Sequence, residues 1–215
     1  MKHFVIEDDH LPYLQVQCGD IAHLIDSPVE WKIAYNARIN NVYKSMLPVL
    51  PEKCDALLDI GGGLSGIGAR LCEHYNYDAL VAVLDGKNTL AVVDKHREPF
   101  NNATKTQTFL RANGVRKQDF YAPTDEVERH FDLVISTQAW CFHIAPYVYQ
   151  QTVSRALRKG GVLIVDVRKS HPEWMDSLVQ AFGMPYLLAE ADKWQRSAFS
   201  VSPLQDGSVP TGTQP

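Results

Sequence analysis

Apolar residues in this chain gather in short continuous runs, each about as long as one strand. Within these runs consecutive positions are apolar, instead of every second position. Because the side chains of a strand alternate between its two faces, this pattern indicates strands buried on both faces, as in a parallel sheet covered by helices. The runs are 56–60, 80–84, 133–136 and 162–167.

A second pattern, with apolar residues three and four positions apart, predicts helices between the runs. The clearest helix covers 28–50, where Ser27 is expected to cap the first turn and Pro28 suits the first helical position. We interpret Gly160 and Gly161 as the C-terminal stop of a helix over 147–157. The other predicted helices are 66–75, 104–113 and 172–182.

Strands and helices therefore alternate, which predicts an α/β fold of the doubly wound, Rossmann-like type: a three-layer sandwich around a mostly parallel seven-stranded sheet. The segment 119–123 supplies a further strand, and the candidates at 185–191 and 194–201 are close enough for an antiparallel C-terminal edge hairpin. Residues 1–50 precede this core as an N-terminal helical cover. The segment 203–215, poor in apolar residues, is expected to be a flexible tail.

Composition narrows the functional classes. The 215 residues are 45% hydrophobic and carry a formal net charge of -4, so the chain has no general basic field to attract nucleic acid or an anionic membrane. Its 4 cysteines are widely spaced, which favours reduced thiols over a disulfide framework or a zinc site. The N-terminus does not resemble a signal peptide, and no apolar run reaches the roughly 20 residues of a membrane span. We expect a soluble, cytoplasmic protein without a bound metal.

The first apolar run leads directly into LLDIGGGLSGIG at 57–68, the most informative segment of the chain. Gly61, Gly62 and Gly63 lack the Cβ atoms that would keep a ligand away from the backbone. The helix that follows has unpaired, partly positive amide groups in its first turn. A nucleotide-like cofactor would suit this loop, although glycine-rich turns also serve as plain tight connections.

The second apolar run ends at Asp85 and Gly86, and ligands of doubly wound folds bind beyond the carboxyl ends of the strands. A carboxylate at this point can accept hydrogen bonds from both hydroxyls of a ribose, and its charge strengthens them. An ordinary solvated Asp in a turn, favoured by the glycine after it, explains the same two residues equally well.

The order of the motifs resembles that of class I S-adenosylmethionine-dependent methyltransferases. The resemblance covers 57–167, and it makes 51–202 the S-adenosylmethionine-binding methyltransferase domain. The motifs that carry it are DIGGG at 59–63, Asp85 at the end of the second strand, FDLVIS at 131–136 and LRKGGVLIVD at 157–166. Ser65 departs from the commonest family loop, because it stands where a third glycine is usual and Gly66 comes one residue later.

The resemblance implies S-adenosylmethionine as the cofactor. Asp59 and the backbone of the three glycines would hold its methionine part, and Asp85 would bind its ribose. Residues 120–122 of the third strand would line the adenine, with Asp119 or Asp125 as an acidic partner. The predicted cofactor-binding residues are Asp59, Gly61, Gly62, Gly63, Asp85, Gly86, Tyr121 and Ser136.

A related fingerprint, G-x-G-x-x-G, binds nicotinamide dinucleotides, and Gly61, Gly63 and Gly66 satisfy it. Asp59 counts against this alternative, because its charge would repel a diphosphate and attract an ammonium or sulfonium group. The motifs at 131–136 and 157–166 also belong to the methyltransferase pattern.

The acceptor is expected near the segment after the fourth strand, STQAWCFHIAPY. Trp140, Phe142 and Tyr147 could form an apolar wall there. His143 is the candidate catalytic base, because its intrinsic pKa lies near neutral pH; a surface or capping histidine is the alternative. Asp166, past the fifth strand, either faces the substrate or only ends the strand.

These residues predict a methyltransferase that acts on a small or medium-sized acceptor, with an oxygen nucleophile as one candidate. No clear signal for nucleic acid or a membrane accompanies them. A cofactor-binding homologue without catalysis and a nicotinamide-dependent reductase are the alternatives. We expect 1–50 to cover the substrate; the acceptor and the oligomeric state do not follow from the sequence.

Overall fold

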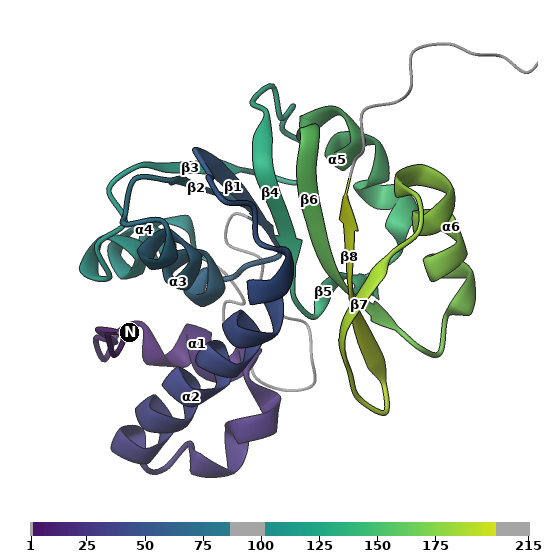
Figure 1. Ribbon diagram of the computed structural model, residues 1–215. Helices are drawn as coiled ribbons and strands as arrows, with labels where there is room; N and C mark the ends of the chain where they lie inside the picture. Colours follow the sequence, from purple (N-terminus) through teal and green to yellow (C-terminus); the bar gives the residue numbers. More distant parts are fainter. Residues whose placement is uncertain (1, 87–101, 201–215) are drawn as a thin grey trace, which may run out of the picture.

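The computed structural model describes residues 2–86 and 102–200, and their strands form a seven-stranded sheet in the order β3-β2-β1-β4-β6-β8-β7 (Figure 1). Strands β1 to β4 and β6 run parallel, whereas β8 is antiparallel to both β6 and β7. The predicted sheet with its antiparallel C-terminal edge hairpin is confirmed. The strands are β1 Ala56–Ile60, β2 Leu80–Leu84, β3 Gln118–Tyr121, β4 Phe131–Ser136, β6 Leu157–Arg168, β7 Tyr186–Glu190 and β8 Trp194–Ser200.

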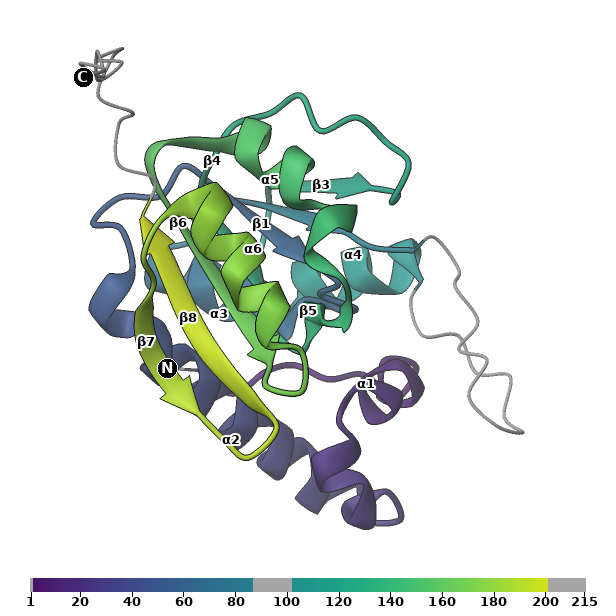
Figure 2. The same cartoon turned by 90° about the vertical axis from the view of Figure 1, so that its right-hand side faces the viewer.

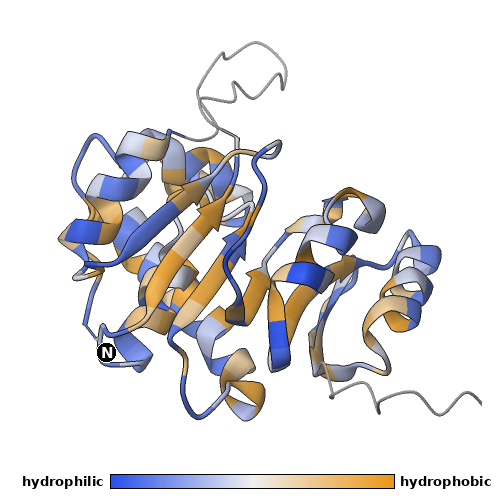
Figure 3. Ribbon diagram, turned by 90° about the horizontal axis from the view of Figure 1, so that it is seen from above, coloured by the Kyte–Doolittle hydropathy of each residue, from blue (hydrophilic) through white to orange (hydrophobic). Residues whose placement is uncertain are grey.

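Neighbouring residues of the central strands point into two separate apolar cores, one on each face of the sheet. Leu57 lies in the core closed by α3 (Gly66–His74) and α4 (Ala103–Ala112). Leu58 lies in the core beneath α5 (Gln150–Ala156) and α6 (Pro172–Phe182), which Figure 2 shows in front of the strands. Figure 3 shows the apolar strands enclosed between these layers. The consecutive apolar positions thus reflect a three-layer sandwich.

A helical cover, defined here as residues 2–50, packs beside α3. It contains α1 (Leu11–Gln17), a 3₁₀ helix η1 (Gly19–Leu24), α2 (Pro28–Met46) and a 3₁₀ turn η2 (Leu47–Val49). Every third or fourth residue of α2 is buried, and Trp31 stacks on Tyr35 with ring centroids 5.2 Å apart. The helix predicted over 28–50 is confirmed for 28–46, and the 3₁₀ turn η2 follows it. Pro28 does start the helix, but the Ser27 side chain makes no capping hydrogen bond, so that part of the prediction is wrong.

The expected helix over 147–157 is confirmed for 150–156, but its ends and its glycine stop are wrong. Its first residues form a 3₁₀ turn η3 (Pro146–Val148), α5 ends at Ala156, and β6 already begins at Leu157. Leu157 pairs with Phe131 of β4, and the register shifts before the next pair. Gly160, at φ +79°, lies inside β6, so the glycine pair shapes an irregular strand instead of stopping a helix.

An additional short strand, β5 (Ala139–Ile144), follows β4 and packs beside β6; it was not predicted. Among the described residues, no helix is both long and apolar enough to cross a membrane. The predicted tail at 203–215 lies outside the described residues.

Candidate functional site

The glycine loop, defined here as residues 61–65, leaves the carboxyl end of β1 and leads into α3. The Gly61 amide donates to the Leu84 carbonyl at the end of β2 (2.8 Å). Gly61 and Gly63 have φ values of +68° and +57°, and Ser65 has +59°. Only glycine adopts such angles without strain, so the two glycines are required by the path of the loop itself.

Asp59 of β1 is fully buried beneath this loop. The Ser65 hydroxyl donates to its Oδ2 (2.7 Å), whereas Oδ1 has no hydrogen-bond partner among the described residues. Burial raises the pKa of Asp59 to about 7; the Ser65 hydrogen bond lowers this pKa and the charge of Asp85 raises it. A Cβ on Gly62 would overlap the Asp59 carboxyl group, so the carboxyl lies directly against the loop backbone.

Asp85 follows β2 and joins the loop from the other side. Its Oδ2 accepts the Gly63 amide (2.9 Å) and its Oδ1 accepts the Gly86 amide (2.7 Å). The Asp85 amide donates to the carbonyl of Tyr121 at the end of β3 (3.1 Å). The ends of three neighbouring strands therefore bring Asp59, the three glycines, Asp85, Gly86 and Tyr121 together.

Three further residues that the sequence did not single out contact the glycine loop. The Thr106 hydroxyl of α4 donates to the Gly63 carbonyl (2.9 Å). A Cβ on Gly63 would overlap the side-chain amide of Gln17, and one on Gly61 would overlap the Ala139 side chain. No local pattern marks these positions, because each reaches the loop from a distant part of the chain.

Ser136, at the end of β4, is fully buried. Its hydroxyl donates to the Ile60 carbonyl (2.8 Å) and accepts the Trp140 amide (2.9 Å). These two bonds link the start of the glycine loop to the turn after β4. Contact of Ser136 with a cofactor stays a prediction.

The segment after β4 does not present the expected apolar wall. Trp140 is fully buried and donates from Nε1 to the Pro146 carbonyl (3.1 Å), whereas Tyr147 is 81% exposed. Phe142 is half-buried, and the Arg168 guanidinium lies 4.6 Å from its ring centroid. The three aromatic residues therefore do not share one surface.

His143, the candidate base, lies on β5 and is exposed. Partial burial and the charge of Arg168 lower the pKa of its imidazole, so the ring is neutral at neutral pH, the form that can accept a proton. No described residue forms a hydrogen bond that orients the ring. Its role as a base stays a prediction.

A buried ion pair connects the two strands next to the turn after β4. Arg196 of β8 binds Asp166 of β6 through two hydrogen bonds, at 2.7 and 2.8 Å, and both side chains are buried. The Gln138 amide also donates to Asp166, and Arg196 donates to the Ser45 hydroxyl of α2 (2.8 Å). One interpretation of the sequence expected Asp166 to face the substrate, but its side chain is buried in this ion pair. Through these contacts it joins the two strands, the turn after β4 and the cover.

The same turn is held by α2 as well. Arg38 donates from Nη2 to Gln138 Oε1 (3.0 Å) and from Nε to the Asp20 carboxylate (3.1 Å). Gln138 has a φ of +54°, so this turn is conformationally strained and needs such support. The cover thereby contacts the region where the acceptor is expected.

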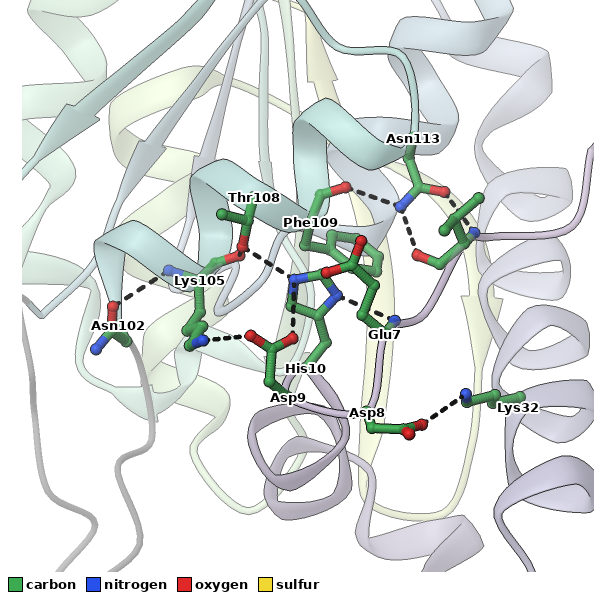
Figure 4. Close-up of polar contacts among 11 residues, drawn as sticks. Glu7, Asp8, Asp9, His10, Lys32, Asn102, Lys105, Thr108, Phe109 and Asn113 are labelled. Atoms are coloured by element: carbon green, nitrogen blue, oxygen red, sulfur yellow. Dashed lines mark hydrogen bonds and ion pairs between the residues drawn. The ribbon is translucent and has the colours of Figure 1, made fainter.

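Glu7, Asp9 and His10 bring potential metal-ligand atoms within 4.8 Å of one another. Other contacts account for this cluster (Figure 4). The Glu7 amide donates to His10 Nδ1, His10 Nε2 bonds the Thr108 hydroxyl (3.0 Å), and Lys105 pairs with Asp9. Nδ1 is therefore engaged within the cover, whereas Nε2 and the Asp9 carboxylate attach the cover to α4.

No family model and no curated protein matches this chain. Solved structures do. A candidate O-methyltransferase of Nostoc punctiforme has a TM-score of 0.55 and 14% identity over 76% of this chain, which spans 56% of that protein. An O-methyltransferase family protein of Burkholderia thailandensis has a TM-score of 0.54 and 11% identity, with 92% of this chain and 74% of that one covered.

A third similar structure is the ribosomal-RNA methyltransferase RsmC of T. thermophilus, in complex with AdoMet and guanosine. It has a TM-score of 0.51 and 16% identity, with 76% of this chain and 39% of that one covered. The similarity to these structures lies in the fold, which in this chain is built on the seven-stranded sheet. The chain therefore has the class I methyltransferase fold.

Proposed function

We propose that this chain is an S-adenosylmethionine-dependent methyltransferase that acts on a small or medium-sized acceptor. The observation that carries the proposal is the buried Asp59 carboxyl group beneath the glycine loop, with Oδ1 unpartnered among the described residues. A buried polar atom without a partner costs free energy unless a ligand supplies one. S-adenosylmethionine has two positively charged groups, an ammonium and a sulfonium, that suit this carboxylate.

The other residues of the site fit the same cofactor. Each carboxylate oxygen of Asp85 accepts one backbone amide, and a carboxylate oxygen can accept more than one hydrogen bond, as the binding of ribose hydroxyls would require. Gly86 and Tyr121 lie beside Asp85 at the ends of neighbouring strands, where an adenine would extend. The diphosphate of a nicotinamide dinucleotide would lie against two carboxylates, Asp59 and Asp85, which disfavours the reductase alternative.

When bound, the cofactor supplies an electrophilic methyl group, and the protein contributes alignment and the exclusion of water. For a hydroxyl acceptor, His143 would take the hydroxyl proton at a ring nitrogen, because its lowered pKa leaves the imidazole neutral. The cover, 2–50, would enclose the acceptor against the turn after β4. Residues 51–202 would then form the methyltransferase domain.

An oxygen nucleophile agrees with the O-methyltransferases among the similar structures, and the RNA methyltransferase among them makes RNA an acceptor to include in a screen. The net charge of -4 favours a small molecule over RNA. The alternative, a cofactor-binding homologue without catalysis, predicts normal binding of S-adenosylmethionine and no methylation of any acceptor.

The first experiment is calorimetric titration of the wild-type protein with S-adenosylmethionine and S-adenosylhomocysteine, and with the reduced nicotinamide dinucleotide as competitor. We expect micromolar binding of the first two only. Absence of that binding, or preference for the dinucleotide, overturns the proposal.

Asp85→Ala should weaken the binding of both sulfur nucleosides by a factor of about 100, because two charge-assisted hydrogen bonds are lost. Asp192→Ala, which removes an exposed carboxylate from the β7–β8 turn, is the matched control and should bind like wild type. Equal affinity of Asp85→Ala and wild type would contradict the ribose assignment.

A further inference from the structure

Gln17, the last residue of α1, reaches the glycine loop from the cover. A Cβ on Gly63 would overlap Nε2, Cδ and Oε1 of its side chain, so the carboxamide lies directly against the Gly63 backbone. The amide of that same glycine donates to Asp85. The Gln17 carboxamide therefore lies where the two proposed cofactor-binding elements meet.

Helix α4 holds both the cover and the loop in this arrangement. On the side of the cover, Lys105 pairs with Asp9 and Thr108 bonds His10, immediately before α1 begins (Figure 4). On the side of the loop, Thr106 donates to the Gly63 carbonyl. Because one helix anchors both partners, the contact between Gln17 and Gly63 is built into the packing and is not an accident of one exposed side chain.

The chemistry of a carboxamide suits this place. It offers two N–H donors and one carbonyl acceptor without a charge. The nearby carboxylates of Asp59 and Asp85 accept hydrogen bonds, so donors for the carboxylate and hydroxyl oxygens of a ligand must come from elsewhere. The half-buried Gln17 carboxamide carries N–H donors of this kind beside the backbone amides of the loop.

We infer that Gln17 binds the cofactor, so that the cover completes the cofactor site as well as enclosing the acceptor. This inference rests on the proposed function, because it concerns the same site. It assigns a ligand-binding role to a residue outside the 57–167 segment that contains the recognised motifs.

The test compares Gln17→Ala and Gln17→Met with Gln15→Ala, each titrated with S-adenosylhomocysteine by calorimetry. Met keeps the length of the side chain and removes its hydrogen bonds, which separates binding from packing. Gln15 belongs to the same helix, but its amide points to the Ile25 carbonyl, so Gln15→Ala is the matched control. Thermal unfolding of each variant without ligand checks that it is folded.

We expect both Gln17 variants to bind about tenfold more weakly than wild type, while the control binds normally. Normal binding by Gln17→Met overturns the inference and leaves the proposed function in place. Absence of binding by wild type overturns the proposed function and the inference with it. Should Gln17→Ala prove unfolded, the Gln17→Met comparison decides.

Discussion

At the scale of single residues, Asp59 combines two properties that rarely occur together. Its carboxyl group is fully buried, and one of its oxygens lacks a partner among the described residues. With a pKa of about 7, the group is protonated in about half of the molecules at neutral pH. A positively charged ligand that contacts it would favour the ionised form, so binding and proton release are coupled.

We therefore predict that the affinity for S-adenosylmethionine rises with pH between about 6 and 8. Below the pKa of about 7 each unit of pH costs up to about tenfold in affinity, because a proton must leave before the cation binds. Calorimetry at several pH values, in two buffers of different ionisation enthalpy, measures both the affinity and the protons released.

The control for this prediction is Asp59→Asn, which cannot ionise. It should bind weakly at every pH and release no proton from this position. A wild-type affinity that is constant from pH 6 to 8 would contradict the assignment of the cation to Asp59.

At the scale of elements, the buried pair of Asp166 and Arg196 joins β6 to β8 and supports the turn after β4. A second ion pair, which is largely exposed, joins Lys169, the residue after β6, to Glu190 of β7. Removing one member of a buried pair leaves the other charge without compensation, whereas an exposed pair contributes little. The two pairs should therefore differ widely in their effect on stability.

Arg196→Met should lower the free energy of unfolding by about 3–5 kcal/mol, because Asp166 would remain buried without its partner. Lys169→Met, the matched control in the exposed pair, should cost less than about 1 kcal/mol. Urea unfolding measures both. The double variant Asp166→Asn with Arg196→Met should recover part of the loss; equal costs for the two single variants would contradict this account.

At the scale of the whole molecule, the cover is attached to the core by polar contacts on two sides. Arg38 and Ser45 of α2 contact the β-sheet region through Gln138 and Arg196. On the other side His10, fully buried, is held between the Glu7 amide and the Thr108 hydroxyl. Since Nδ1 accepts a hydrogen bond, Nε2 carries the proton of the neutral ring, and a second proton would break the bond to Glu7.

Stability should consequently fall as the pH drops below about 6.5. Burial lowers the pKa of His10 in the folded chain. The charges of Asp9 and Glu7 raise this pKa, and the charge of Lys105 lowers it further. The unfolded chain then binds the additional proton first, so the contribution of His10 is fully present above its unfolded pKa and is lost as pH falls through the folded one.

Urea unfolding of wild type at pH 7.5 and 5.5 measures this loss. His10→Gln should be less stable than wild type at pH 7.5 and should lose less stability between the two pH values. His130→Gln, which alters an exposed histidine, is the control and should keep the wild-type dependence. An unchanged dependence in His10→Gln would show that other groups cause it.

Local patterns in the sequence determined the positions of most strands, the sheet class and the position of the glycine loop. Continuous apolar runs and glycines with no Cβ act within a few residues, so their consequences appear in the sequence itself. Asp59 and Asp85 could be found in the same way, because each follows from its place at the end of a strand. The prediction from Gly160 and Gly161 was wrong, because two glycines that can stop a helix also fit an irregular strand, and the pairing of that strand depends on a distant partner.

Only the tertiary structure decided which residues surround the site. Thr106 and Gly63 are 43 positions apart, and Asp166 and Arg196 are 30 apart; no periodicity within a segment relates them. Gln17 belongs to a short helix with no motif of its own, and it meets the loop because α4 holds the cover against the core. Contacts of this kind arise from the packing of whole elements, which a pattern along the chain does not encode.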